Sequence, residues 1–168
     1  EKLLDAFLEA GKIAIEMNHK GLKITNKIDN TPVTNADLAV DQLLREKVKS
    51  LTPGLPIISE ETTNLEIKNI NKTFWLIDPI DGTKEYIKKN DEYTLNAALI
   101  ENLKPVAGII YAPAKDRLFF SYGIGKAYEI CNGRKKILNC KKLNNNNKEI
   151  IALINSDITP KEIIDIHK

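Results

Sequence analysis

Two aspartates that follow a short apolar run are the residues of this sequence best suited to chemistry. The run at residues 74–77, FWLI, has the length and bulk of a buried strand, and DPIDGT follows it. Pro79 disfavours helix at Asp78, so the sequence predicts that the strand ends at residue 77 and that a stiff loop carries Asp78 and Asp81. Gly82 lets the backbone approach a ligand closely. Two carboxylates at one place predict a hard divalent cation, Mg²⁺, that bridges to a phosphate.

Three interpretations of this segment are open from the residues alone. The first is a strand followed by an ordinary Asp-Pro turn. The second is a phosphatase whose aspartate is itself the nucleophile; that class carries its acids as D-x-D, whereas two residues separate Asp78 from Asp81. The third is a metal cluster in which an activated water attacks phosphorus directly, and this interpretation predicts more carboxylates elsewhere in the chain.

Two further acidic positions could supply those carboxylates. Asp37 lies three residues after Thr34, which is the spacing of a helix capping box, and the alternative is that Asp37 takes a proton from a catalytic water. Glu60 and Glu61 follow an apolar strand predicted at residues 55–58. Paired glutamates there are either a solvated turn or site ligands, since sheet-built sites collect their ligands at the carboxyl ends of strands.

Two further segments could bind an anion. A short helix predicted over residues 84–88 would direct its free N–H groups and its positive dipole end at the loop that carries the aspartates. Gly123 and Gly125, which precede Lys126, have a partial likeness to a phosphate loop, but the full glycine pattern and the strand-to-helix setting are missing. A β-turn is the better interpretation of that pair.

Two amphipathic helices and a set of short strands would position these acids. Apolar residues recur at helical spacing over residues 1–18 and 34–51, and Pro53-Gly54 ends the second helix. A short strand or extended loop is predicted at 22–28, a loop or frayed helix at 64–72, and an antiparallel meander at 93–100, 106–111, 117–122 and 126–131. The predicted fold is therefore α+β in layers, with helices packed on a largely antiparallel sheet.

Residues 1–140 are predicted as one N-terminal domain that carries the acids. The polar segment 141–148, KKLNNNNK, has the composition of a linker. An apolar strand and a capping box with Pro160 at the first helical position follow at 149–168, and they are interpreted as the start of a second α/β domain that is incomplete.

Composition narrows the class of protein. With 42% hydrophobic residues, 168 residues can build a proper core, and 25 basic against 23 acidic residues favour a small-molecule substrate over a nucleic-acid polymer. Cys131 and Cys140 are too few for a disulfide framework, so they are interpreted as reduced thiols in a cytoplasmic protein. No run reaches transmembrane length, and no signal peptide is visible in a chain that opens at Glu1.

Four acids taken together carry a resemblance to a known family: Asp37, Glu60, Asp78 and Asp81. They resemble the acids of the Mg²⁺-dependent, lithium-sensitive phosphatases of the inositol monophosphatase superfamily. The resemblance implies a layered α/β sandwich of the sugar phosphatase type. The family signature is similar to residues 75–83, WLIDPIDGT, with Glu-Glu upstream. KEY at 84–86 and YTLN at 93–96 resemble the 3'(2'),5'-bisphosphate nucleotidase branch, whereas inositol monophosphatases usually have Thr-Asn-Phe at 84–86.

The resemblance implies a role for each of these positions. It implies two or three Mg²⁺ ions held by Glu60, Asp78, the main-chain carbonyl of Ile80 and Asp81, with Asp78 bridging two of them. Asp37 and Thr83 would together orient and deprotonate the attacking water. The backbone N–H groups of Gly82 and Thr83 would bind the phosphate of a substrate that also lies against Glu60.

The implied activity is removal of the 3'-phosphate of 3'-phosphoadenosine 5'-phosphate, giving AMP and phosphate within sulfur metabolism. An inositol or other small phosphomonoester phosphatase stays open, and so does a non-catalytic metal- or nucleotide-binding module. The family pattern also includes a metal-binding aspartate in a late Trp-Asp motif and most base contacts; these 168 residues lack them, so little activity is expected of this piece alone. A homodimer and a loose peripheral attachment to the inner membrane face stay open too.

Overall fold

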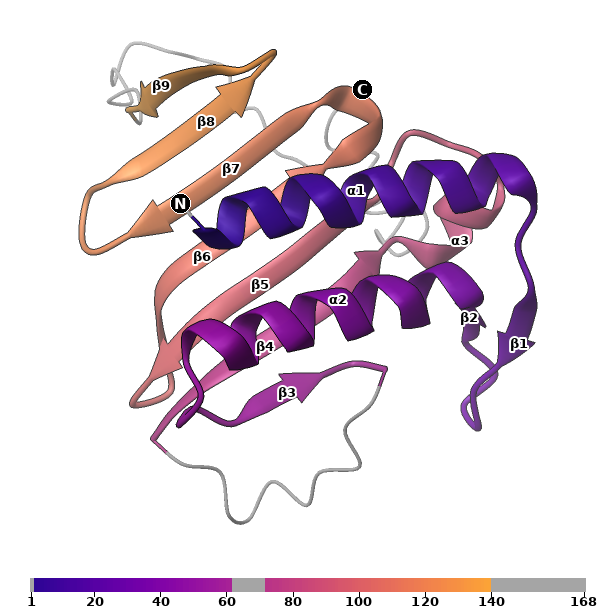
Figure 1. Cartoon of the computed structure of the whole chain (residues 1–168), viewed down its shortest axis with the longest axis horizontal. Helices are drawn as coiled ribbons and strands as arrows, with labels where there is room; N and C mark the ends of the chain where they lie inside the picture. The colour runs from indigo at the N-terminus through magenta and orange to yellow at the C-terminus, as the bar shows by residue number, and fades with distance from the viewer. Residues whose placement is uncertain (1, 62–71, 140–168) are drawn as a thin grey trace, which may run out of the picture. The chain divides into compact units, whose positions relative to one another are not determined.

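A computed structural model describes residues 2–61 and 72–139. Two long helices, α1 (Lys2–Lys20) and α2 (Asn35–Leu51), lie side by side across one face of a β-sheet (Figure 1). In the sequence, the segment that joins the two helices forms a small hairpin from β1 (Ile24–Asn26) and β2 (Pro32–Thr34). The helices layered on the sheet confirm the predicted α+β fold.

The sheet has seven strands that are neighbours in chain order. They are β3 (Ile57–Ser59), β4 (Thr73–Asp81), β5 (Thr94–Glu101), β6 (Lys104–Ala112), β7 (Arg117–Tyr122), β8 (Ala127–Cys131) and β9 (Arg134–Leu138). β3 pairs with β4 in parallel, and every later pair is antiparallel. The predicted meander is thus confirmed, and the Gly123–Gly125 segment is the turn between β7 and β8.

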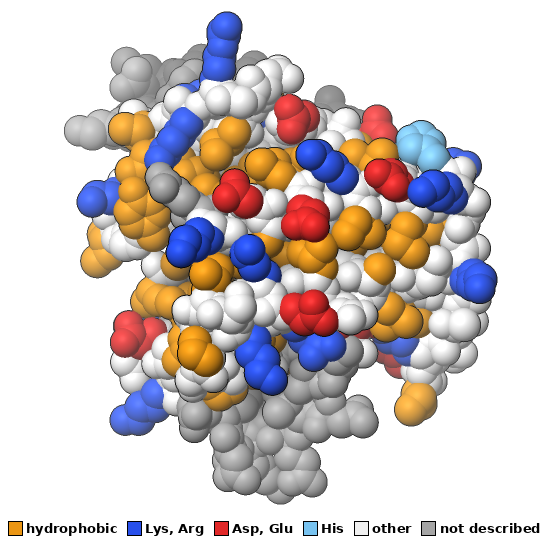
Figure 2. Space-filling view, in the orientation of Figure 1, with side chains coloured by type: hydrophobic (Ala, Val, Ile, Leu, Met, Phe, Trp, Pro, Cys, Tyr) orange, Lys and Arg blue, Asp and Glu red, His pale blue; other side chains and the backbone are white. Residues whose placement is uncertain are grey.

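The core lies between the helices and the sheet. Phe7, Val40 and Leu44 from the helices pack with Ile77 and Leu95 from the central strands, and all five are buried. At Gly11 a Cβ atom would lie 2.3 Å from Cε1 of Tyr111, so α1 lies directly against β6 at this point. On the outer surface of this layer basic and acidic side chains are interspersed among hydrophobic ones (Figure 2), in keeping with the nearly balanced charge.

The prediction that the strand ends at residue 77 is wrong. β4 continues through Asp78 and Pro79 to Asp81, with a register shift against β5 between Asp78 and Asp81. Proline is tolerated at such a bulge because the irregular stretch requires no ladder hydrogen bond from it. The two aspartates therefore sit on a strand braced by its neighbour and not on a free loop.

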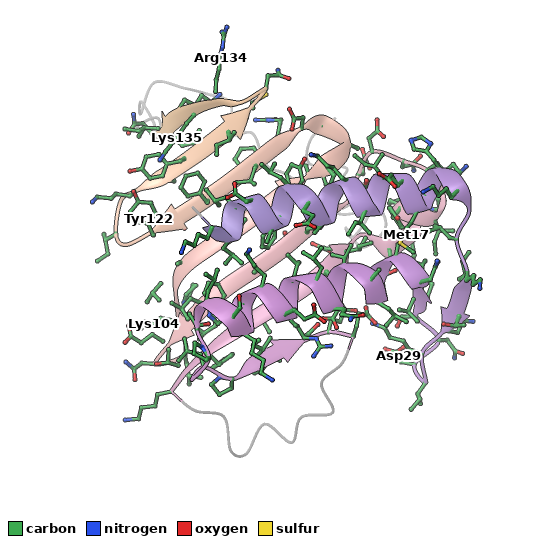
Figure 3. All side chains as sticks on the ribbon, in the orientation of Figure 1. Met17, Asp29, Lys104, Tyr122, Arg134 and Lys135 are labelled. Carbon is green, nitrogen blue, oxygen red and sulfur yellow. The ribbon has the colours of Figure 1, made fainter. Side chains whose placement is uncertain are left out.

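Two strands were not predicted. β9 is mostly charged, with Arg134, Lys135 and Lys136 in sequence, and it forms the last edge of the sheet in the described part of the chain. Figure 3 shows Arg134 and Lys135 there, with Tyr122 of β7 at the same end of the sheet. β2 is a three-residue strand that begins at Pro32. Neither has the apolar alternation by which strands are recognised.

The face of the sheet opposite the helices carries an apolar hollow of about 430 Å³. Leu76, Ile110 and Phe119 line it, together with Asp78 and Asn96. Leu76 and Ile110 are 45% and 49% exposed, so the two faces of the sheet differ sharply in burial.

Several predictions fall outside the described residues. These are the polar segment at 64–72 except for Lys72, the linker at 141–148, the second domain at 149–168, and Cys140. Among the described residues, Cys131 forms no disulfide. Across residues 2–61 and 72–139, no helix combines the length and hydrophobicity needed to span a bilayer.

Candidate active site

The parallel pairing of β3 with β4 brings the predicted acids together. Ser59 is the register partner of Ile77, and the N–H of Glu60 donates to the Ile77 carbonyl at 3.1 Å. Glu60, which directly follows β3, therefore lies beside Asp78 of β4, and Asp81 is the last residue of β4. The position of Glu60 is thus set by pairing between segments that are distant in sequence.

Asp78 is the most perturbed of these carboxyls. Burial, followed by the negative charges of Glu60 and Asp81, raises the pKa of Asp78 to about 7. Its Oδ1 atom is buried and has no hydrogen-bond partner. A carboxylate held among like charges with an unmet acceptor is suited to a cation, because a cation would relieve both the repulsion and the missing contact.

Asp37 completes the helix cap and also contacts Thr83. Its Oδ2 accepts from the N–H and Oγ1 of Thr34 at 2.8 and 2.5 Å, and Thr34 Oγ1 accepts from the Asp37 N–H in return, so the capping box of α2 is complete. The other oxygen, Oδ1, lies 3.3 Å from Thr83 Oγ1. Burial raises the pKa of Asp37 although its hydrogen bonds act in the opposite direction, and a carboxylate with a raised pKa is a stronger base.

Thr83 opens α3 (Thr83–Ile87) directly beyond the second aspartate. Its hydroxyl also lies 3.0 Å from the Ile80 carbonyl, so the single proton can be donated to Ile80 or to Asp37. Gly82 before it has φ +90°, and a Cβ there would lie 2.8 Å from the Glu92 carbonyl oxygen. Only glycine fits this turn without strain, and the turn sets the direction in which Thr83 leaves the strand.

The short helix α3 is fixed to the rest of the fold by one aromatic residue. Tyr86 is fully buried, its hydroxyl donates to the Ala14 carbonyl of α1 at 2.6 Å, and its ring packs edge-on against Tyr93. Asn18 of α1 donates to the Tyr86 carbonyl at 2.6 Å. α1 therefore holds the element that carries Thr83, although it supplies none of the acids.

A lysine outside the predicted set contacts the acidic end of β3. Lys27 follows β1, and its Nζ lies 2.8 Å from both Glu60 Oε1 and Glu61 Oε1. Burial lowers the pKa of Lys27, but its hydrogen bonds and attraction to Glu60 and Glu61 outweigh burial and raise it. The hairpin that carries Lys27 lies beyond the ends of the two helices, where Asp29 is labelled in Figure 3.

The oxygen atoms gathered here suit a hard cation, although they are not arranged as in a metal site that holds its ion. Carboxylates and a main-chain carbonyl are the oxygen ligands that Mg²⁺ prefers, and Asp78 Oδ1 lacks a partner. Within residues 2–61 and 72–139, no three Asp, Glu, His or Cys side chains are placed so that they could hold one ion together. Lys27 Nζ lies against one carboxylate oxygen of Glu60, so this oxygen is already engaged.

Sequence reasoning also missed a buried polar group behind the acids. Asp41 of α2 is 1% exposed; it accepts from Arg45 Nε at 2.8 Å and from the Ser59 hydroxyl. Because Ser59 is the last residue of β3, this contact fixes the strand end from which Glu60 emerges. The sequence signal that could have identified Asp41 is its spacing: it lies four residues after Asp37, so both acids lie on one face of the helix.

Comparison with known proteins decides the family. The model described as "Inositol monophosphatase family" matches residues 2–164. The chain belongs to the inositol monophosphatase family. The resemblance inferred from the acidic motif is therefore confirmed, and family members have the layered fold described above.

Individual members resemble the chain over different lengths. It is 42% identical over 120 residues to the 3'(2'),5'-bisphosphate nucleotidase CysQ of Escherichia coli K12, which is 70% of this chain and 48% of that protein. The solved CysQ of Bacteroides thetaiotaomicron is 30% identical with a TM-score of 0.59, and covers 98% of this chain and 54% of its own. A solved IMPase/NADP phosphatase with Mg²⁺ and phosphate is 26% identical with a TM-score of 0.65, covering 79% and 50%. The chain thus spans about half the length of these relatives.

Proposed function

We propose that the full-length protein containing this chain is a Mg²⁺-dependent phosphomonoesterase that removes the 3'-phosphate of 3'-phosphoadenosine 5'-phosphate, giving AMP and phosphate. The observation that carries the proposal is the contact between Asp37 and Thr83 beside the acidic ends of β3 and β4. A module that only binds metal or nucleotide has no need of a carboxylate and hydroxyl held together at this position. The similarity to CysQ proteins supports the choice of substrate.

In this proposal Glu60, Asp78, Asp81 and the Ile80 carbonyl hold two or three Mg²⁺ ions. Bound Mg²⁺ would supply a water of lowered pKa and would neutralise charge on the phosphate. The solved relative with Mg²⁺ and phosphate supports this choice of metal. For Glu60 to take part, its carboxylate has to leave Lys27.

The chain's own residues then handle the proton. Thr83 turns its hydroxyl proton towards Asp37, so its lone pairs face an attacking water, and Asp37 is the base that accepts the proton through this pair. The backbone N–H groups of Gly82 and Thr83 face the phosphate. Water attacks phosphorus directly and no covalent enzyme intermediate forms, because this proposal assigns every carboxylate of the site to a metal ion or to the base.

The test is phosphate release by the full-length protein with Mg²⁺, comparing 3'-phosphoadenosine 5'-phosphate with inositol 1-phosphate, each with and without Li⁺. We expect hydrolysis of the nucleotide to dominate and Li⁺ to abolish it. Preference for inositol 1-phosphate would assign the protein to the other branch of its family. Release from neither substrate, in a protein that binds Mg²⁺, would favour a binding module. Cytoplasmic location and a homodimer stay predictions.

A further inference from the structure

Asn96 of β5 contacts the acidic site from the neighbouring strand. Asn96 and Asp78 are register partners in the antiparallel pair β4–β5. The Asn96 amide nitrogen, Nδ2, donates to Asp81 Oδ2 at 3.2 Å. One side chain therefore stands opposite the first aspartate and holds the second.

The amide can take only one of its two orientations here. A carboxylate without a proton only accepts hydrogen bonds, so the nitrogen of Asn96 must face Asp81 and the oxygen must face away. That oxygen, Oδ1, is buried without a partner. Among the residues that the structure describes, Asp78 Oδ1 is the other buried side-chain oxygen or nitrogen without a hydrogen-bond partner.

Two buried acceptor oxygens without partners, on adjacent strands, indicate which kind of ligand the site binds. Buried oxygens of this kind are costly unless a donor or a cation reaches them. Asp78 and Asn96 are cross-strand partners, so one group bound beside Asp78 is within reach of both residues. A hydrated divalent cation matches the pair, because Mg²⁺ retains several waters whose protons need acceptors beyond the direct ligands.

The contact with Asp81 has a second effect. Asp81 is exposed, and an exposed carboxylate loses rotational freedom when it binds an ion. The Asn96 amide already restrains Asp81 through one oxygen and leaves the other available. We infer that Asn96 is a positioning residue for the divalent cation, which orients Asp81 and offers Oδ1 to the cation's hydration shell. This inference rests on the proposed function, since it concerns the same Mg²⁺ site.

The test measures Mg²⁺ affinity by titration calorimetry on the full-length protein, in wild type and in Asn96→Leu. Leucine has the branched shape of asparagine and suits an apolar sheet face, but it lacks the amide. Groups that orient metal ligands typically alter metal affinity by about 10–100-fold, so we expect Mg²⁺ binding to weaken at least about tenfold. The Mg²⁺ concentration that half-saturates phosphate release should rise by the same factor, whereas a general structural defect would lower turnover without that shift.

Ser121→Ala is the matched control, because Ser121 lines the same hollow from β7. Its Mg²⁺ affinity should equal that of wild type. If Asn96→Leu does not fold, Asn96→Ala replaces it, since alanine removes the amide without adding volume to this face. Wild-type affinity in a folded Asn96 variant would overturn the inference, whereas failure of the wild-type protein to bind Mg²⁺ would instead remove the proposed function.

Discussion

Thr83 Oγ1 lies 3.3 Å from Asp37 Oδ1, although 46 positions separate the two residues in the sequence. Asp37 is placed by the capping box at the start of α2, and Thr83 is placed by the glycine turn at the end of β4. Each local structure would form without the other. Their contact joins a helix cap to a strand end, and this junction is where the proposed water activation takes place.

Asp37→Asn should lower phosphate release by about 10²–10⁴-fold, the usual contribution of a general base, and leave Mg²⁺ binding nearly unchanged. The asparagine side-chain oxygen can still accept from the Thr34 N–H in the capping box, so the melting temperature should change little. Thr83→Ala should lower turnover in the same way. Because the pair acts as one unit, the double variant should lose little more than the worse single variant. Wild-type turnover in Asp37→Asn would remove Asp37 from the mechanism.

Mg²⁺ binding should weaken at acidic pH because the pKa of Asp78 is about 7. Below that pH the metal competes with a proton, so affinity should fall up to about tenfold per pH unit. Without metal, the stability of the fold should change in the opposite direction. The raised folded-state pKa of Asp78 favours the fold at low pH, and this contribution is lost as pH rises from 3.8, the usual pKa, to about 7. Calorimetry and urea unfolding across this range measure both slopes, and Asp78→Asn should flatten them.

Lys27→Gln should strengthen Mg²⁺ binding several-fold, because it removes the ammonium group that competes for Glu60 and Glu61. Lys20→Gln is the matched control. Lys20 also pairs with a glutamate, Glu16 at 3.2 Å, but that pair is exposed on α1. Equal Mg²⁺ affinities in the wild type and Lys27→Gln would show that the lysine does not compete with the metal.

Gly82→Ala should destabilise the protein more than Gly123→Ala, although both glycines have positive φ angles of 90° and 70°. At Gly123 a Cβ meets nothing within 4 Å, so the cost is backbone strain alone, about 1–2 kcal/mol. At Gly82 the Cβ also meets the Glu92 carbonyl at 2.8 Å, so the turn before Thr83 must shift. Chemical unfolding measures the difference, and only Gly82→Ala should also lose turnover. Equal destabilisation would mean that this turn is not constrained.

The sequence by itself determined the elements and the identity of the acids. The helices α1 and α2, the capping box at Thr34 and the meander from β5 to β8 follow from periodicity and from short-range chemistry, which a contiguous stretch contains in full. The motif with Asp78 and Asp81 likewise needs no partner to be recognised. The end of β4, in contrast, depends on a partner strand. Pairing with β5 extends β4 through Pro79, and no local sequence signal predicts such pairing.

Only the tertiary structure decided which side chains face these acids. Lys27 reaches Glu60 because the β1–β2 hairpin lies beside the end of β3, and Asn96 reaches Asp81 because of the register between β4 and β5. A one-residue change of register would turn Asn96 to the other face of the sheet. Charge and hydrogen bonding act through space, so the pKa of Asp78 and the partners of Glu60 depend on folding that brings distant segments together.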